Sequence, residues 1–386
     1  MSLLLTLGAK ADEDGRPANP LPDGYWSRPL AAQGQAPAGW SELETALDPA
    51  ACGACHPDKL AEWQGSLHAK AFSPGLIGQL LTFSPEDTQA CLDCHAPLAE
   101  QAAAFEAARR QGKAHRPEAQ GLAAAGNSCG GCHLRGHQRF GPPPRDGTRD
   151  AAPPHGGFSA NAGFERAEFC AACHQFDADQ AVNGKPLENT VAEWRASPQA
   201  AAGLTCQSCH MPDRKHLWRG IHDPATVAAG LTAKVSADAA GARFTLTSTG
   251  VGHAFPTYVT PKAILHAVLL DAAGRPRPGT EVHRVIGRRV DFDGTDWRET
   301  ADTRLRPNQS AAVDIAWAGA KRARLWLEIQ PDDFYHSVTY AQLLRDLPKS
   351  GEARRLIAEA DARAKASVYT LFTTEIERPA ASGESP

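Results

Sequence analysis

Ten cysteines and five of the histidines in this 386-residue sequence share one repeated pattern. Two residues separate the cysteines of each pair, and a histidine directly follows the second cysteine. The pattern uses every cysteine of the chain, in five motifs: Cys52, Cys55 and His56; Cys91, Cys94 and His95; Cys129, Cys132 and His133; Cys170, Cys173 and His174; and Cys206, Cys209 and His210. Two thiols at this spacing can add to the two vinyl groups of a haem, and the adjacent imidazole then reaches the iron. The sequence therefore predicts five covalently bound haem c groups, each with its iron held by a proximal histidine.

Other uses of the cysteines fit this pattern poorly. A disulfide framework would not place a histidine after each second cysteine. A structural zinc site would gather its ligands rather than leave separate pairs along the chain. Because the haems account for all the thiols, no cysteine remains as a nucleophile, and we assign no catalytic residue.

Each haem iron needs a sixth ligand unless it stays open. The chain has only two methionines, and Met211 directly follows His210, where it is poorly placed to turn back onto the same iron. Methionine ligation raises haem potentials, so its near absence predicts bis-histidine haems of low potential. Ten histidines remain beside the proximal ones. The five that we expect to be distal ligands are His68, His155, His216, His222 and His253.

The positions of these histidines are the reason for the choice. His68 lies on the helix predicted after the first haem site, and His155 lies between prolines and glycines, where the backbone could approach a porphyrin. His216 and His222 lie just after the fifth haem site. His253 lies at a turn between two predicted strands, from which it could reach back to the haem domain. The weaker candidates are His115, His137, His266, His283 and His336.

A short repeat connects two of the intervals between haem sites. Residues 62–69 read Glu-Trp-x-x-Ser-x-His-Ala, and residues 193–200 read Glu-Trp-x-x-Ser-x-Gln-Ala. The second copy therefore has Gln199 in the place of His68. Two interpretations remain open at this point. Either Glu-Trp merely begins two similar helices, or the first copy carries an iron ligand that the second copy has lost.

The pattern along the chain predicts a multidomain α+β protein. Residues 1–48 form a signal remnant and an extended lead-in, and residues 49–224 form a loop-rich, mainly α pentahaem domain. Alternating apolar and polar residues over 229–330 predict six or seven short strands in an antiparallel β-sandwich. Residues 331–386 form a C-terminal helical segment, with a helix near 352–367 and a disordered tail.

Composition and chemistry indicate an exported protein. The net charge of −4 and the pI of about 6.4 give no basic field for nucleic acid. Covalent haem attachment takes place outside the cytoplasm in bacteria, so we expect a periplasmic or extracellular protein. The apolar run Leu3–Leu7 and the sequence Ala9-Lys10-Ala11 resemble part of a signal peptide, which we interpret as truncated rather than as an ordinary flexible terminus. We expect no stable membrane span, because no later stretch is long and apolar enough.

From residue 49 to about residue 180 the chain resembles the tetrahaem cytochrome c-554 family. The residues that carry the resemblance are the haem motifs and the Trp-x-x-Ser-x-His-Ala-Lys-Ala element, at 52–56, 63–71, 91–95, 126–133 and 169–174. Residues 206–212 and 252–257 resemble parts of larger exported multihaem cytochromes that have a C-terminal β domain.

The resemblance implies electron transfer through closely stacked haems. It implies that His68 ligates the third haem rather than its nearest one, and that a histidine after the third site, His155 or His137, returns to the first haem. It also implies that the haem at His95 can be five-coordinate. The fifth haem and the β domain depart from the family, so its partner is not carried over.

Three functions are compatible with these features. The first is an electron carrier between other redox proteins, such as cytochromes, oxidoreductases or a quinol-oxidising membrane cytochrome, through transient polar interfaces. The second is a reductase of a small nitrogen or sulfur oxyanion at one open haem, favoured by Gln199 but not by the five regular motifs. The third is a subunit of an oligomer or haem polymer that takes a ligand from its neighbour, which the spare histidines make unnecessary. We expect an electron-transfer protein rather than an enzyme.

Overall fold

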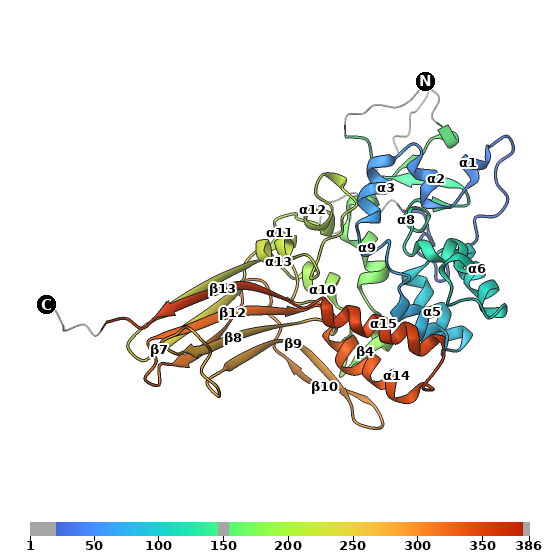
Figure 1. Cartoon of the computed structure of the whole chain (residues 1–386). Helices are drawn as coiled ribbons and strands as arrows, with labels where there is room; N and C mark the ends of the chain where they lie inside the picture. Colours follow the sequence, from blue (N-terminus) through green and yellow to red (C-terminus); the bar gives the residue numbers. More distant parts are fainter. Residues whose placement is uncertain (1–20, 146–153, 381–386) are drawn as a thin grey trace, which may run out of the picture. The chain divides into compact units, whose positions relative to one another are not determined.

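The computed structural model describes residues 21–145 and 154–380 (Figure 1). The backbone contacts divide the chain into two compact units that interleave along the sequence. Residues 173–204 and those from 218 onwards form the second unit, and the first unit contains the remaining residues, including 205–217.

Some predictions fall on parts of the chain that the structure does not describe. The proposed signal remnant at Leu3–Leu7 and Ala9–Ala11 and most of the predicted disordered tail lie outside the described residues. The predicted domain bounds, with a haem domain over 49–224 and a β domain over 229–330, stay predictions.

Short helices connected by loops make up most of the first unit. Several begin with a proline, which fits the first helical position because its missing N–H would have no acceptor within the helix. Asp48, Ser73 and Ser84 cap three of these helices by accepting backbone N–H bonds. The helices are α1 (Glu42–Thr45), α2 (Pro49–Gly53), α3 (Pro57–Gln64), α4 (Pro74–Leu80), α5 (Pro85–His95), α6 (Ala99–Arg110), α7 (Pro117–Gln120), α8 (Cys129–His133), α9 (Ala167–His174), which ends in the second unit, and α12 (Cys206–His210). Three short strands accompany them, β1 (Leu134–Arg135), β2 (Gln138–Gly141) and β3 (Ser159–Ala160).

Aromatic side chains fix the lead-in before α1 to the first unit. Tyr25 is buried, and the ring of Trp26 packs edge-on against Phe169 with centroids 5.0 Å apart. Trp40 contacts the ring of His137 in the same edge-on manner, at 6.1 Å. The two tryptophans therefore pin this segment to the first unit.

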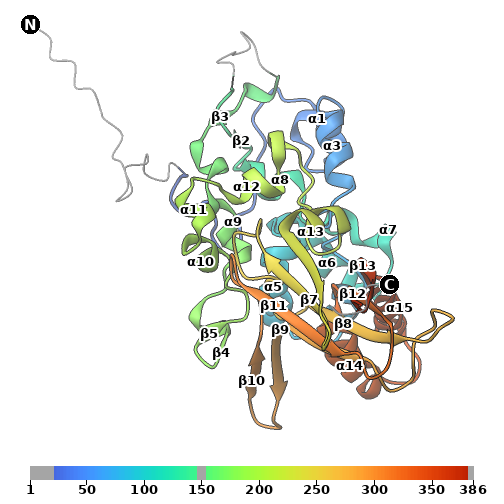
Figure 2. The same ribbon diagram turned by 90° about the vertical axis from the view of Figure 1, so that its left-hand side faces the viewer.

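Two antiparallel sheets dominate the second unit (Figure 2). Their strand orders are β10-β9-β8-β12-β13 and β11-β7-β6. The strands are β6 (Leu231–Ala237), β7 (Gly241–Ser248), β8 (Lys262–Leu270), β9 (Val282–Phe292), β10 (Trp297–Asp302), β11 (Ser310–Ala316), β12 (Arg322–Gln330) and β13 (Tyr369–Glu377). The remaining elements are the hairpin β4 (Ala181–Val182) and β5 (Lys185–Pro186), and the helices α10 (Thr190–Arg195), α11 (Pro198–Ala201), α13 (Pro224–Gly230), α14 (Ala341–Asp346) and α15 (Glu352–Ala366).

One apolar core lies between these two sheets. Alternate residues of each strand enter it, because successive side chains of a strand point to opposite faces. Leu265 from β8, Leu325 and Leu327 from β12 and Phe244 and Leu246 from β7 are all fully buried there. The alternation that predicted strands over 229–330 is therefore the pattern that fills this core.

The predicted α+β class with antiparallel strands is confirmed, and the helix expected near 352–367 is present as α15. The sequence analysis missed β13, which pairs with β12 as the edge strand of the larger sheet. Its apolar alternation is interrupted at a register shift, where Phe372 adopts a positive φ of 53°. Within the described parts of the chain, no helix combines the length and the apolar character that crossing a membrane requires.

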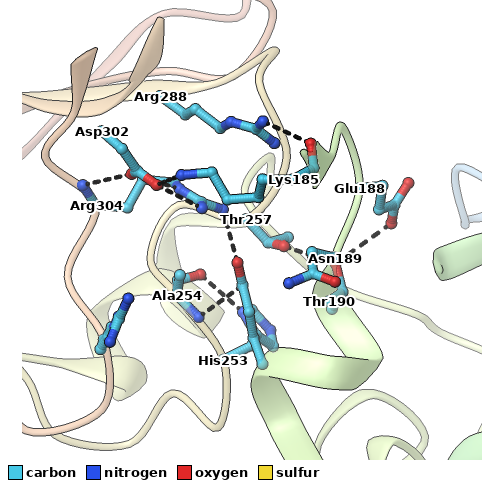
Figure 3. Close-up of polar contacts among 12 residues, drawn as sticks. Lys185, Glu188, Asn189, Thr190, His253, Ala254, Thr257, Arg288, Asp302 and Arg304 are labelled. Atoms are coloured by element: carbon cyan, nitrogen blue, oxygen red, sulfur yellow. Dashed lines mark hydrogen bonds and ion pairs between the residues drawn. The ribbon is translucent and has the colours of Figure 1, made fainter. Parts of the chain in front are cut away.

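Arg288 of β9 attaches the β4–β5 hairpin to the larger sheet (Figure 3). Its side chain has no exposed surface, and it donates to the carbonyl oxygens of Lys185 at 2.9 Å and Pro186 at 2.5 Å. It also forms an ion pair with Glu299 at 2.6 Å. Because these contacts involve residues 185 and 186, they help explain why the segment 173–204 belongs to the second unit.

Replacing Arg288 with methionine should destabilise the second unit by about 3 kcal/mol, because the hairpin carbonyls and Glu299 would lose a buried donor. Chemical denaturation of the holoprotein, followed by far-UV circular dichroism, measures this. The matched control is Arg289→Met, because Arg289 follows in the same strand and its side chain is 73% exposed. We expect that control to change the stability by less than about 0.5 kcal/mol. Equal stability of the two variants would contradict the role given to Arg288.

Candidate haem-binding sites

The five cysteine–histidine motifs all lie on short helical turns. The helices α5, α8, α9 and α12 each end at the histidine of their motif. In the first motif, at the end of α2, the amide of His56 donates to the carbonyl of Cys52 at 2.9 Å, which is the same helical turn. On a helix, residues i, i+3 and i+4 share one face. Each helix therefore presents two thiols and an imidazole to one side, which is the arrangement that a covalently attached haem needs.

The cysteines that we predict as attachment points are free thiols in the structure, and none forms a disulfide. Two of them, Cys55 and Cys209, are exposed. The others are half-buried, namely Cys52, Cys91, Cys94, Cys129, Cys132, Cys170, Cys173 and Cys206. A thiol has to be reachable from outside the fold to add to a vinyl group, and these exposures allow it. The thioether bonds themselves stay a prediction.

The two cysteines of the fourth motif belong to different compact units. The division of the chain falls inside α9, with Cys170 in the first unit and Cys173 and His174 in the second. The second motif is regular by comparison, since Cys91, Cys94 and His95 all belong to the last turn of α5.

The first and third motifs lie side by side in the first unit. The thiols of Cys52 on α2 and Cys129 on α8 are hydrogen-bonded to each other, and this contact lowers the pKa of Cys52 to about 7. Haems attached to these two helices would therefore be neighbours although their motifs are far apart in the sequence.

Three of the proximal histidines are oriented by a hydrogen bond at Nδ1. His95 bonds the carbonyl of Ala71 at 3.1 Å, and His133 bonds the carbonyl of Phe140 at 2.7 Å. His174 bonds a carboxylate oxygen of Glu188 at 2.9 Å. Carbonyl and carboxylate oxygens only accept, so Nδ1 carries the proton and Nε2 carries the lone pair that binds iron. The donor set of two thiols and an oriented imidazole fits haem c.

The Trp-x-x-Ser-x-His element connects α3 to the third motif. The indole nitrogen of Trp63 donates to the carbonyl of Asn127 at 2.9 Å, and the amide of Asn127 donates to the carbonyl of His68 at 3.0 Å. Asn127 lies two residues before Cys129. Gly126 makes the close approach possible, because a Cβ on it would lie 2.9 Å from the His68 carbonyl. The backbone of His68 is therefore held beside the segment that leads into the third haem motif.

The same element also contacts the second motif and a candidate distal ligand. The carbonyl of Ala71 accepts the Nδ1 bond from His95 of the second motif. The carboxylate of Glu62 accepts the backbone N–H of His216 at 2.9 Å. One stretch of the chain, from Glu62 to Ala71, thus positions parts of the second and third motifs and a further histidine.

The second copy of the element repeats these contacts inside the second unit. The indole nitrogen of Trp194 donates to the carbonyl of Leu204 at 2.9 Å, and the amide of Leu204 donates to the carbonyl of Gln199 at 3.0 Å. Leu204 lies two residues before Cys206, as Asn127 does before Cys129. The matching bonds favour a true structural repeat over two helices that merely begin alike.

The repeat includes the acidic residue and extends to His253. The carboxylate of Glu193 accepts the backbone N–H of Ala254 at 3.1 Å, as Glu62 accepts that of His216. A Cβ on Gly252 would lie 3.3 Å from the Cβ of Gln199, so the residues around His253 pack against the second copy. The amide oxygen of Gln199 is buried and has no hydrogen-bond partner among the described residues. Gln199, which has the position of His68 in the second copy, therefore lies next to the loop that carries His253.

Two predicted distal ligands lie in the first unit with His68. Nδ1 of His155 bonds the carbonyl of Gly157 at 3.1 Å, which leaves Nε2 as the nitrogen for iron. The ring of His216 lies 6.1 Å from the ring of His133. Burial, with a smaller contribution from His133, lowers the pKa of His216 to about 4. This imidazole is therefore neutral near pH 7, the form that ligates a metal.

The other two predicted distal ligands lie in the second unit. Nδ1 of His253 bonds the carbonyl of Ala254 at 2.9 Å, so its Nε2 carries the lone pair (Figure 3). His222 is placed differently, because its Nε2 faces the carboxylate of Asp332 at 2.9 Å. In this conformation His222 could reach an iron only through Nδ1.

No pattern in the sequence predicted the residues that orient the proximal histidines. Glu188 lies 14 positions after His174, and no motif in the sequence connects them. Phe140 and Ala71 act through their backbone carbonyls, which no residue type reveals. Asn127 could have been noticed, since it directly precedes the third motif, but its role depends on contacts with residues about 60 positions away.

Gly126→Ala should displace His68 and leave one haem with a weakened or missing sixth ligand. Gly126 has a φ of 58°, and its new Cβ would clash with the His68 carbonyl, at a cost on the order of 1–3 kcal/mol. EPR of the oxidised protein should show a new high-spin signal. Gly112→Ala is the control, because Gly112 has a φ of 66° but no atom within 4 Å of its added Cβ. A wild-type EPR spectrum for Gly126→Ala would contradict this placement of His68.

Known proteins resemble this chain in sequence over one segment and in fold over most of its length. Residues 51–133, which hold the first three motifs and the Trp63 element, match the family model described as cytochrome c554 and c-prime. The crystal structure of a penta-haem cytochrome c552 from Thermochromatium tepidum has a similar fold, with a TM-score of 0.60 at 19% sequence identity. The similarity covers 87% of this chain and 100% of that one. No curated protein matches the sequence. The motifs and the family match make residues 51–133 similar to cytochrome c554 and c-prime, and the fold of the chain is similar to that of a penta-haem c-type cytochrome.

Proposed function

We propose that this protein is an exported electron carrier that passes electrons through five haem c groups, most of them bis-histidine, between other redox proteins. The observation that carries the proposal is the segment Glu62–Ala71, whose hydrogen bonds reach residues of the second and third motifs. A carrier needs haems held at fixed, short separations, and this segment supplies that constraint through backbone and indole contacts. The penta-haem cytochrome of similar fold supports the count of five.

Haem iron supplies reversible one-electron chemistry when the haems are bound. The chain's part is to attach the haems through its ten thiols, to hold the proximal imidazoles, and to bring distal imidazoles to the opposite faces. We propose His68 as a ligand of the third haem, because its carbonyl is bonded to the residue two positions before Cys129. His155, His216, His222 and His253 remain the candidates for the other haems.

The axial ligands set the range of potentials that the carrier covers. Two imidazoles on an iron give a lower potential than an imidazole and a thioether. Met211 is the only methionine within the described residues, and it follows His210 directly. We therefore expect low-potential haems, and partners that exchange electrons in the same range, such as other multihaem cytochromes, oxidoreductases or a membrane quinol-oxidising cytochrome.

Export follows from the cofactor. Covalent attachment of haem to these motifs takes place outside the cytoplasm in bacteria, so a chain with five such motifs is expected in the periplasm or outside the cell. The net charge of −4 is modest, which suits transient association with several partners rather than strong electrostatic capture by one.

One observation favours a second candidate function, the reduction of a small nitrogen or sulfur oxyanion. Gln199 takes the place of His68 in the second copy of the element, and its amide oxygen is buried without a partner among the described residues. A glutamine offers no imidazole, so the haem served by this copy needs another ligand or stays open. His253 lies next to Gly252, which packs against Gln199, and a ligand from this loop would restore six-coordination. The reductase is the alternative for the case in which His253 does not ligate this iron and the haem stays open.

An anaerobic reductive titration of the holoprotein tests the carrier function. The chain should take up five electrons, and the reduced protein should pass them to a redox dye without consuming nitrite, hydroxylamine or sulfite. The matched control is the double variant Cys91→Ser with Cys94→Ser, which should take up four electrons because only the second haem loses its thioether bonds. Steady consumption of one of these oxyanions by the reduced protein would contradict the carrier and favour the reductase.

A further inference from the structure

Two buried N–H groups near the third haem motif have no acceptor among the described residues. They are Nη2 of Arg135 and the indole nitrogen of Trp26. The guanidinium carbon of Arg135 lies 5.0 Å from the centre of the Trp26 ring and 4.0 Å from the centre of the Tyr25 ring. The two donors therefore belong to one cluster. Leaving such groups buried without an acceptor is unfavourable, and more so for a charged group.

The rest of the Arg135 guanidinium is held in place by the backbone. Its Nε donates to the carbonyl of Tyr25 at 2.6 Å, and its Nη1 donates to the carbonyl of Gly131 at 3.1 Å. No carboxylate of a described residue pairs with it. A guanidinium fixed between two aromatic rings gains from the cation–π contacts, but these do not replace a counter-ion. The cluster is therefore built to accept an anion.

The cluster lies at the third haem motif. Arg135 follows His133 by two residues, and the hydroxyl of Tyr25 donates to the carbonyl of Cys132 at 2.6 Å. The ring of His133 stacks on Phe164 with centroids 5.1 Å apart, and Phe164 in turn packs against Tyr25. The same aromatic side chains thus contact both the proximal histidine and the cationic cluster.

Each haem c carries two propionate side chains, which are carboxylates near neutral pH. We propose that Arg135 and Trp26 bind a propionate carboxylate of the third haem, with Arg135 as the residue that neutralises its charge. The inference rests on the proposed function, because it requires a haem at the third motif. A cation at this place favours the reduced iron, which has one positive charge fewer, so Arg135 is a positioning residue that raises the midpoint potential of that haem.

The test is a potentiometric titration of the holoprotein, followed by EPR, for Arg135→Gln and Arg135→Lys. In Arg135→Gln one midpoint should move to a more negative potential, and in Arg135→Lys it should stay close to wild type because the charge remains. Trp26→Phe keeps the ring and loses the N–H, so it should move the same midpoint in the same direction by less. The haem affected should be the one whose EPR signal changes in His68→Ala.

A matched control is Arg109→Gln in the first unit. The guanidinium of Arg109 is partly buried, but its donors already bond Glu106 and the carbonyl of Phe83, so no midpoint should move. Unchanged midpoints in both Arg135→Gln and Trp26→Phe, in protein that still takes up five electrons, would overturn this inference and leave the carrier function intact. A shift confined to a haem other than the one affected by His68→Ala would overturn the assignment to the third haem.

Discussion

The hydrogen bond from the amide of Asn127 to the carbonyl of His68 holds the Trp63 element against the segment before the third haem motif. The indole N–H of Trp63 also donates to the carbonyl of Asn127. These two hydrogen bonds connect α3 and the residues after it to the segment that leads into α8. Gly126 permits that contact because any side chain there would strike the His68 carbonyl. His68, which lies between the first and second motifs in the sequence, is thereby held near the third motif.

The same set of hydrogen bonds occurs twice in the chain. Trp194, Leu204 and Gln199 reproduce the bonds of Trp63, Asn127 and His68, including the two-residue interval before the next cysteine. The backbone contacts survive the replacement of histidine by glutamine because they use only carbonyl and amide groups. The element therefore has a structural role in both copies, and only the first copy has a histidine that could ligate iron. In the second copy, Glu193 accepts the backbone N–H of Ala254 and also forms an ion pair with Arg304 at 3.0 Å. These contacts bind the second copy to the strands and loops of the second unit.

Local patterns in the sequence predicted the features that local chemistry decides. The haem motifs follow from the spacing of thiols and imidazole on one helical face, and the strands from alternation of buried residues such as Leu265 and Leu327. The repeat was visible, but only the bonds of Trp194 separated the two interpretations. The hydrogen bond between His174 and Glu188 and the bonds from Arg288 to the hairpin carbonyls were not predictable. They are tertiary contacts between residues that no sequence motif connects. The strand β13 was missed because a bulge at Phe372 interrupts its alternation.

The central claim is that imidazoles of this chain occupy the sixth positions of its haems, so that the protein carries electrons rather than binding a substrate at iron. The most direct test is the visible spectrum of the dithionite-reduced protein before and after carbon monoxide, together with EPR of the oxidised form. The account predicts low-spin EPR signals and no spectral shift with carbon monoxide. A clear shift together with a high-spin signal would reveal an accessible open iron and contradict the claim.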